Sequence, residues 1–274
     1  MKNMPKINRL LLILSLGASI LFAGNTSNLT GKEIMQKVID RDDGDNIVTT
    51  MQMQLIDKNK HKRVRDMKTF SKDIGDDEKK LIFFLSPSDV KNTAFLTFDY
   101  NNDDKDDDQW LYLPALNKIK RIPSSDKDSS FMGSDFTYFD MTKPNLDDFN
   151  FKILKNSIVK RKSGNQKVWL IEITPKSKEI MNETGYKKSI AYVRTDKFMI
   201  TRAKYFLKKA GRVKYMDVKK TAVIDGIETN MLTSMITKKG KRTLHKTLLI
   251  NKEVKMNQGL KEDMFSTRTL EKGI

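Results

Sequence analysis

Two histidines, His61 and His245, are the first residues of this 274-residue sequence that could do chemistry. They lie far apart along the chain and have no partner at metal-ligand spacing, so a zinc site would need carboxylates for most of its coordination. The sequence contains no G-x-S-x-G elbow for a nucleophile and no glycine-rich loop for a phosphate. We therefore predict no catalytic residue, no metal and no cofactor, and interpret His245 as a hydrogen-bonded structural histidine. An envelope hydrolase that uses Asp, Glu or His245 is the alternative.

Two acidic runs could bind calcium, one at 40–45 and one at 99–108. Calcium-binding EF-hand loops have a glycine at the sixth position and a bidentate glutamate at the twelfth. Neither run meets both conditions, and in the second run these positions are Asp104 and Trp110. We favour solvated loops between strands, with calcium binding as the alternative.

The N-terminus has the layout of a secretory signal peptide, with a short basic segment and then an apolar run from Leu10 to Ala23. This run is shorter than the roughly 20 residues that a membrane-spanning helix needs. We predict a signal peptide at 1–23 that is cleaved after Ala23. Because Leu21 occupies a position where a small residue is usual, an uncleaved N-terminal anchor is the alternative. The chain has no cysteine, which excludes disulfides and lipid attachment at a lipobox.

The chain is strongly basic, with a formal net charge of +17. Removal of the signal peptide would take away three cations, Lys2, Lys6 and Arg9, and no acid, leaving +14. On an exported protein this excess favours anionic lipid headgroups or acidic partners over nucleic acid. A charge that serves solubility alone is the alternative.

The elements that would position these residues are mainly strands. Thr30 and Glu33 form a capping box, which predicts a helix at 31–40. The Asp225-Gly226 pair between alternating runs predicts a hairpin. Three near-continuous apolar runs are typical of strands buried on both faces: 81–87, 93–99 and 110–116.

The spacing of these runs predicts an antiparallel meander in a single domain over 24–274. Residues 123–148 break the strand rhythm, and we predict a long functional loop or a short helical insert that acts as a lid or rim. Aromatic residues and methionines gather at 81–113 and 131–141. Methionine adapts to irregular apolar ligands, so these segments indicate either a lipid cavity or an ordinary core.

Several segments, taken in order, resemble the LolA-like outer-membrane lipoprotein-sorting family. They are WLYLPALNKIKRI at 110–122, SFMGSDFTYFDM at 130–141, VWLIEITPK at 168–176, YVRTDKFMITRAKYF at 192–206 and IDGIETNML at 224–232. The most specific are L-P-A-x-x-K-x-K-R-I and F-M-G-S-D-F, which look characteristic of the branch distinct from the classical periplasmic lipoprotein carrier. The resemblance implies a mainly β fold with some α: a curved antiparallel sheet that forms an incomplete, half-open β-barrel. Helices and loops would cover its concave apolar face.

The same resemblance implies a periplasmic carrier of the Gram-negative envelope that shields acyl chains in an apolar cavity for transfer toward the outer membrane. Its expected cargo is lipoprotein acyl chains or another lipid. Its expected partners are an inner-membrane transporter or release complex and an outer-membrane acceptor. We expect a monomer that touches membrane surfaces transiently and binds no nucleic acid. The alternatives are an accessory protein that carries a hydrophobic molecule for an RND-type export pump and a structural adaptor that binds protein.

On this resemblance, seven residues would contact lipid in the cavity or lid: Trp110, Tyr112, Leu113, Phe131, Met132, Phe136 and Tyr138. Gly133 would permit a tight turn among them. A basic cluster would contact headgroups or a partner, with a solvated strand end as the alternative: Lys118, Lys120 and Arg121. The functional residues of the classical carrier have no matching positions here, so none is carried over.

Overall fold

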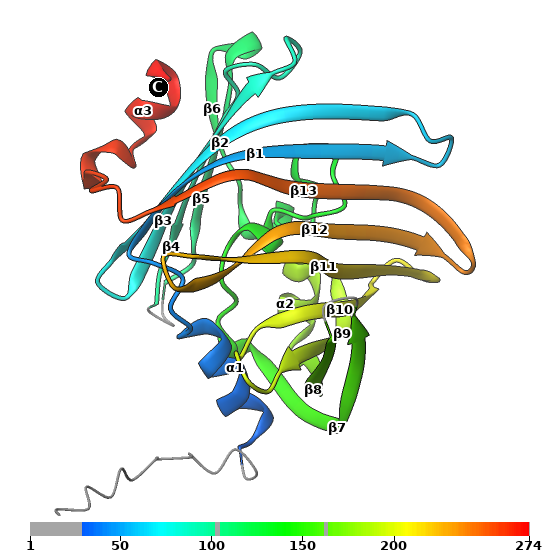
Figure 1. Ribbon diagram of the computed structural model, residues 1–274. Helices are drawn as coiled ribbons and strands as arrows, with labels where there is room; N and C mark the ends of the chain where they lie inside the picture. Colours follow the sequence, from blue (N-terminus) through cyan, green and yellow to red (C-terminus); the bar gives the residue numbers. More distant parts are fainter. Residues whose placement is uncertain (1–28, 102–104, 162–163, 274) are drawn as a thin grey trace, which may run out of the picture.

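A computed structural model describes residues 29–101, 105–161 and 164–273, and the predicted signal peptide at 1–23 lies outside these ranges. The described residues form thirteen strands and three α-helices, with short 3-10 turns between them (Figure 1). Within the same ranges, none of the helices has the length and apolar character that crossing a membrane requires.

The strands and helices have the following bounds. The strands are β1 (Asn46–Asp57), β2 (Lys62–Ile74), β3 (Asp77–Ser86), β4 (Ala94–Asp99), β5 (Asp108–Leu113), β6 (Lys118–Arg121), β7 (Phe149–Arg161), β8 (Gly164–Pro175), β9 (Tyr186–Arg194), β10 (Ile200–Leu207), β11 (Arg212–Ile224), β12 (Ile227–Lys239) and β13 (Arg242–Met256). The helices are α1 (Gly31–Ile39), α2 (Lys178–Thr184) and α3 (Thr267–Lys272).

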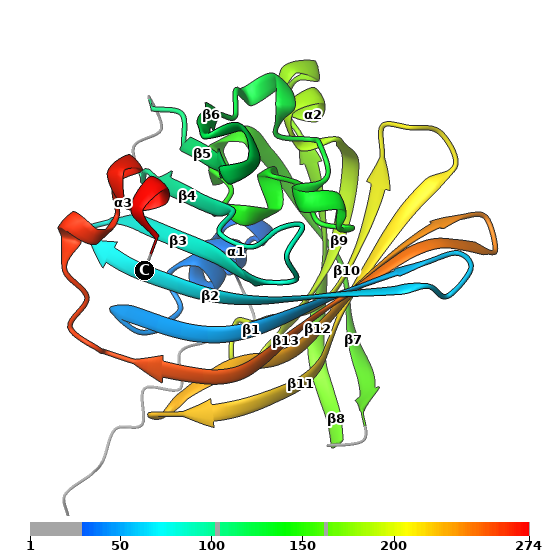
Figure 2. The same cartoon turned by 90° about the horizontal axis from the view of Figure 1, so that it is seen from above.

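All thirteen strands belong to one antiparallel sheet in the order β6-β5-β4-β3-β2-β1-β13-β12-β11-β10-β9-β8-β7. Two meanders, β1 to β6 and β7 to β13, meet where β1 pairs with β13. The sheet curves strongly (Figure 2), but within the described residues its edge strands β6 and β7 do not pair with each other. The predicted fold class, a mainly β protein with a half-open antiparallel barrel, is therefore confirmed.

Helix α1 begins at the capping box that the sequence predicts. The Glu33 N–H donates to Thr30 Oγ1 at 3.2 Å, and the Thr30 N–H donates to Glu33 Oε2 at 2.7 Å. Its apolar side, with Ile34 and Met35, packs against inward side chains of β8 and β9 such as Trp169. The helix thus covers part of the concave face.

The predicted burial of the central runs on both faces is confirmed in β3 and β4. Ile82 and Phe84 point into the concave side, while Leu81 and Phe83 point to the convex side. The C-terminal segment around α3 covers that convex side and buries Leu270 against it (Figure 1). This part of the sheet therefore has apolar layers on both faces.

Elsewhere the strands alternate. In β1, Met53 and Leu55 are buried on the concave side, whereas Gln52 and Gln54 on the opposite face hydrogen-bond to each other at 2.7 Å. The predicted hairpin at Asp225-Gly226 joins β11 and β12 with φ values of +49° and +85°. Positive φ at both central turn residues matches the right-handed twist of the paired strands.

Replacing Leu270 with alanine is expected to lower the free energy of unfolding by roughly 2–4 kcal/mol, because a fully buried side chain leaves a cavity against the convex face. Leu116→Ala is the control, since Leu116 is 63% exposed, and its change is expected to stay within about 0.5 kcal/mol. Urea unfolding measures both. Equal effects would mean that the C-terminal segment does not dock as described.

Candidate functional site

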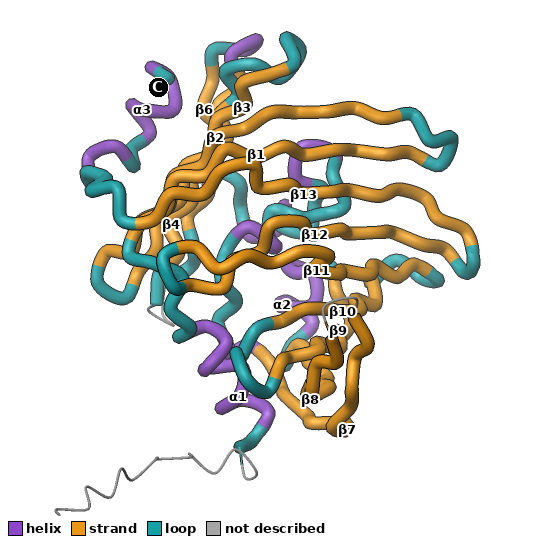
Figure 3. Tube along the Cα trace, in the orientation of Figure 1, coloured by secondary structure: helices purple, strands orange, loops and turns teal. Residues whose placement is uncertain are grey.

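The segment between the sheet's edge strands, residues 122–148, is called the insert here. It leaves β6 at one edge, crosses the open side of the sheet and enters β7 at the other edge (Figure 2). Its backbone forms four 3-10 turns rather than a longer helix (Figure 3): Ser124–Asp126, Phe131–Gly133, Phe139–Met141 and Leu146–Asp148.

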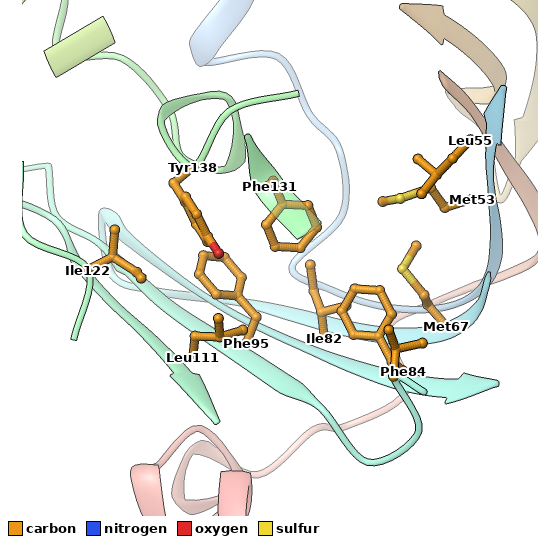
Figure 4. Close-up of a cluster of buried hydrophobic side chains, with 11 residues drawn as sticks. Met53, Leu55, Met67, Ile82, Phe84, Phe95, Leu111, Ile122, Phe131 and Tyr138 are labelled. Carbon is orange, nitrogen blue, oxygen red and sulfur yellow. The ribbon is translucent and has the colours of Figure 1, made fainter. Parts of the chain in front are cut away.

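Two aromatic residues of the insert fill the concave face over β2 to β5. Phe131 packs 5.1 Å from Phe95 and 6.2 Å from Phe84 between ring centroids, and Tyr138 lies 5.6 Å from both Phe95 and Phe131 (Figure 4). Phe131 is only 1% exposed. This half of the barrel is therefore occupied by the protein's own side chains.

Asp135, in the F-M-G-S-D-F segment of the insert, is fastened to the opposite wall of the barrel. Its buried carboxylate accepts hydrogen bonds from Thr237 Oγ1 at 2.5 Å on β12 and from Thr247 Oγ1 at 2.7 Å on β13. His245 Nδ1 lies 2.7 Å from the same carboxylate, and the Asp135 N–H donates to Thr247 Oγ1. We call this group of four residues the Asp135 anchor.

Other polar contacts hold the insert to β2 and β5. The Arg65 guanidinium donates to the carbonyl of Met132. Gln109 Nε2 donates to the carbonyl of Tyr138 at 2.9 Å. Because both donors are themselves buried, the insert is the part of the chain that satisfies them.

A third set of contacts involves β9 and β11. The Tyr186 hydroxyl donates to Asp140 Oδ2 at 2.8 Å and accepts from Lys214 Nζ at 3.0 Å. Burial, followed by the Asp140 carboxylate, raises the pKa of Tyr186 well above its usual value, so the phenol keeps its proton. Burial lowers the pKa of Lys214, with Asp140 opposing that change.

An apolar pocket of about 240 Å³ remains on the other half of the concave face, between the insert, α1 and strands β7 to β12. It has a predominantly apolar lining that includes the small side chains of Ala191 and Ala203. The other apolar lining residues are Met35, Phe136, Phe139, Pro144, Leu146, Phe149, Phe151, Ile173, Pro175, Tyr186, Ile200, Tyr205, Met216 and Met235. We call this the apolar pocket.

The structure separates the seven residues predicted to contact lipid. Phe136 lines the apolar pocket, whereas Phe131, Met132, Tyr138 and Leu113 belong to the packed cluster on the other half of the concave face. Trp110 and Tyr112 lie on the convex face of β5 and pack with the C-terminal segment. Alternate residues of a strand face opposite sides, so positions 110 and 112 cannot share the concave face with 111 and 113.

The predicted basic cluster lies on β6, the short edge strand. Arg121 Nε lies 3.0 Å from Asp108 Oδ1, and Lys120 Nζ lies 3.3 Å from Asp126 Oδ2. Lys118 is exposed. Two of the three cations therefore already have carboxylate partners, and their contact with headgroups stays a prediction.

A larger hollow of 510 Å³ lies at the end of the sheet where α1 ends, β1 begins, and the β2–β3 turn and β4–β5 loop meet. It is lined by carboxylates from both acidic runs and from the turn. Burial raises the pKa of Asp99 to about 7, and Asp107 adds to the shift. Burial also raises the pKa of Asp73 to about 6. In Glu78 the opposing effect of Lys80 and Lys143 outweighs burial and lowers the pKa to about 2.

Carboxylates of the acidic runs accept hydrogen bonds from backbone N–H groups in the loops at the ends of the strands. Asp99 Oδ2 accepts the Lys143 N–H at 2.5 Å, Asp107 Oδ1 accepts the Tyr100 N–H at 3.1 Å, and Asp42 Oδ1 accepts the Gly44 N–H at 3.0 Å. Among the described residues, no group of three or more metal-binding side chains has a geometry that could hold an ion. Asp103 and Asp104 lie outside the described residues.

The histidines occupy different environments. His245 belongs to the Asp135 anchor, and in the described part of the chain Asp135 is the one hydrogen-bond partner of its ring. The His61 ring is exposed on the β1–β2 turn and lies 3.0 Å from Asp57. The interpretation of His245 as a hydrogen-bonded histidine agrees with this geometry.

Several proteins of known structure have a fold similar to this one. A protein of the DUF1329 family from Desulfovibrio piger has a similar structure, with a TM-score of 0.77 and 27% identity over 88% of this chain and 97% of that one. A domain from Vibrio parahaemolyticus, provisionally assigned as an outer membrane lipoprotein-sorting protein, has a TM-score of 0.76 and 30% identity over 88% of this chain and 98% of that one. A LolA superfamily protein from Nitrosomonas europaea has a TM-score of 0.64 and 16% identity over 88% of this chain and 99% of that one. A family model described as an uncharacterized protein matches residues 76–272. No curated protein matches the sequence.

This half-open antiparallel barrel has the LolA-like fold. With its extensive match to the Vibrio parahaemolyticus domain, the chain belongs to the LolA-like outer-membrane lipoprotein-sorting family, as the sequence resemblance implied.

Replacing Asp135 with alanine is expected to lower the free energy of unfolding by roughly 2–4 kcal/mol, because two buried threonines and the partly buried His245 lose their acceptor. Asp126→Ala is the matched control in the same insert, since its exposed pair with Lys120 is worth less than about 1 kcal/mol. Urea unfolding gives the totals, and hydrogen exchange of 129–141 shows whether the insert loosens. Similar losses in both variants would contradict the anchoring role.

Asp99→Asn is expected to become more stabilising, relative to the original protein, as pH rises from 5 to 8. The folded-state pKa of about 7 exceeds the unfolded value, so the folded protein holds the extra proton at low pH and loses that stability as pH rises through 7. The relative gain in unfolding free energy between these pH values should approach roughly 3 kcal/mol, and asparagine keeps an acceptor for the Lys143 N–H. Unfolding curves at both pH values measure it. A pH-independent difference would place the Asp99 pKa near its usual value.

Proposed function

We propose that this protein is a lipid-binding carrier that holds an acyl chain in the apolar pocket while the cargo crosses the periplasm toward the outer membrane. The observation that carries the proposal is a predominantly apolar pocket on the concave face of a half-open barrel, covered by the insert. Burial of an acyl chain stabilises the complex by about 0.8 kcal/mol per methylene, so a pocket of this kind favours lipid over a polar ligand. The related Vibrio parahaemolyticus domain, provisionally assigned to lipoprotein sorting, supports the same class of cargo.

The size of the pocket limits the cargo in the closed form. Its volume of about 240 Å³ is below the roughly 300–1,000 Å³ of typical small-molecule sites. A cargo with several acyl chains would therefore need space that Phe131 and Tyr138 now fill. We infer that the insert moves away from the concave face to admit such cargo, with Phe131 and Tyr138 exchanging protein contacts for lipid contacts.

The way the insert is fastened suits such exchange. It is held by hydrogen bonds and ring contacts and not by a continuous strand pairing with the sheet. A neutral hydrogen bond such as that of Gln109 with the Tyr138 carbonyl contributes about 1 kcal/mol after exchange with water, and the Asp135 anchor roughly 2–4 kcal/mol. Burial of several methylenes of cargo, at about 0.8 kcal/mol each, can offset either. Weakly attached segments are the usual source of gates in binding proteins.

The proposal requires no catalysis, metal or cofactor. Its finer parts are release from an inner-membrane transporter or release complex and delivery to an outer-membrane acceptor. Transport of another hydrophobic molecule for an RND-type export pump uses the same pocket, and the identity of the bound cargo separates the two. The proposed periplasmic location rests on the N-terminal sequence and on the lipoprotein-sorting relative.

Ala203→Leu tests the pocket directly, because Ala203 lines it and three added carbons would occupy part of its volume. The chain from Gly24 would be expressed in the periplasm of a Gram-negative host and purified without detergent, and bound molecules would be identified by native mass spectrometry and lipid extraction. We expect near-stoichiometric lipid or acylated protein on the original chain and at least a fivefold loss in the variant.

Ala210→Leu is the matched control, since the same side chain is added at an exposed turn position. Overpacking costs about 1–3 kcal/mol, so urea unfolding must show that both variants remain folded. A protein that is empty when purified and ignores an added fatty acid would exclude the proposal. Triacylated protein in the pocket would identify lipoprotein as the cargo, and free lipid would favour the export-pump alternative.

A further inference from the structure

Three neighbouring hairpins project from one end of the sheet, and their turns form a strongly basic surface. They are the turns β1–β2, β12–β13 and β10–β11, which follow one another in the strand order β2-β1-β13-β12-β11-β10. Figures 1 and 2 show all three extending to the same side, beyond the rest of the barrel. We define the basic tips as residues 57–63, 207–212 and 238–242.

The basic tips concentrate the charge of the whole chain. They contain four, three and four Lys or Arg residues, respectively, and one carboxylate, Asp57, so these 18 residues carry a net charge of +10. The complete 274-residue chain carries +17. The eleven cations are Lys58, Lys60, Lys62, Arg63, Lys208, Lys209, Arg212, Lys238, Lys239, Lys241 and Arg242.

These cations have few partners of their own. Lys208 pairs with Asp128 at 2.5 Å, and none of the other ten forms an ion pair with a carboxylate in the described ranges. Like charges this close repel one another, and salt screens them only over about 8–10 Å. A surface that keeps them together is stabilised by an external anion array.

Aromatic rings are interleaved with cations beside the tips. Lys204 Nζ lies 4.6 Å from the centre of the Phe206 ring, and Lys238 Nζ lies 5.7 Å from that of Tyr215. Tyr215 is 39% exposed and, with Phe206 and Arg212, lines a surface groove at the base of the β10–β11 turn. Tyrosine beside lysine is typical of surfaces that sit at the headgroup level of a bilayer, because the ring contacts apolar carbon while the cation contacts phosphate.

The opposite end of the sheet carries the acidic hollow, in which carboxylates outnumber cations. Asp42, Asp45 and Asp76 are among its lining residues, and it lies where β1 begins and β4 ends. An anionic surface would therefore attract the basic tips and repel the far end of the molecule. Such separation orients a protein on approach as well as attracting it.

We propose that the basic tips are a docking surface for anionic phospholipid bilayers, which orients the sheet with its hairpins toward the membrane. This inference rests on the proposed carrier function, to which it adds the side from which cargo is exchanged. It moves the principal headgroup contact from the predicted cluster at Lys118, Lys120 and Arg121, two of which are ion-paired, to the hairpin turns. Strand β10 lies between the two sites, since Tyr205 on one of its faces lines the apolar pocket and its neighbour Phe206 on the other face lines the groove.

The test uses the chain from Gly24 and vesicles of phosphatidylcholine with or without 30% phosphatidylglycerol, with binding measured by co-sedimentation at 50 and 300 mM salt. The tip variant combines Lys58→Gln, Lys60→Gln, Lys239→Gln and Lys241→Gln, all at exposed positions in or beside the turns. The matched control combines Lys152→Gln, Lys155→Gln, Lys160→Gln and Lys220→Gln, which removes the same charge from exposed strand positions.

We expect salt-sensitive binding to the anionic vesicles, at least a tenfold weaker affinity in the tip variant and less than a threefold change in the control. Equal losses in both variants would overturn the proposal, because net charge alone would then explain binding. No binding to anionic vesicles at 50 mM salt would also overturn it and would point to an acidic protein as the partner of the tips.

Two further measurements keep docking separate from cargo binding. The tip variant should retain its bound lipid in native mass spectrometry, since the substituted residues do not line the apolar pocket. A Tyr215→Trp variant should show a blue shift of its added fluorescence when anionic vesicles are present, and an unchanged spectrum would contradict insertion at the headgroup level. The Ala203→Leu variant should show the converse: it should lose its cargo and still bind anionic vesicles, because the substitution changes the pocket alone.

Discussion

The structure depends on how two distant edges of one sheet are joined. β6 and β7 are consecutive in the chain but lie at opposite ends of the thirteen-strand order, so the segment between them must cross the open side of the barrel. Crossing places backbone N–H and C=O groups over an apolar surface, where each needs a hydrogen-bond partner. Arg65 and Gln109 donate to the carbonyls of Met132 and Tyr138, and Thr247 in the Asp135 anchor accepts the Asp135 N–H. These contacts fix the depth of the insert in the barrel.

The depth of the insert then decides what space is left. Phe131 and Tyr138 occupy the half of the concave face over β2 to β5, where the opposing side chains are large. Over β9 and β10 the inward positions include Ala191 and Ala203, and the apolar pocket remains there. Under the insert, the concave face thus has one half that is filled by side chains and one half that keeps a pocket. Asp140 and Tyr186, which hydrogen-bond to each other, both line the apolar pocket.

The fold could be predicted from the sequence because the patterns that specify it are local. The capping box at Thr30, the apolar runs of β3 and β4 and the Asp225-Gly226 turn each specify backbone geometry over a few residues. The site was less accessible. From the sequence alone, Trp110 and Tyr112 have the apolar character expected of cavity residues. In the structure they lie on the convex face of β5, where the C-terminal segment covers them. The available signal for the pocket was subtler: small residues at inward positions of β9 and β10 leave room, but strand alternation alone does not distinguish the inward side from the outward one.

The packing of the C-terminal segment on the convex face affects the stiffness of the sheet. Its side chains from Leu260 to Leu270 give β3, β4 and β5 an apolar layer on each face, whereas the hairpins β10–β11 and β12–β13 have one face in water. A sheet clamped on both faces resists bending, while a single-layer sheet twists more freely. The two walls of the barrel therefore differ in stiffness, and the wall under the C-terminal segment is the more rigid one. Thermal bending of such a sheet is concentrated in the wall that has a single apolar layer, so in the opening proposed above this wall can adjust to acyl chains of different shape.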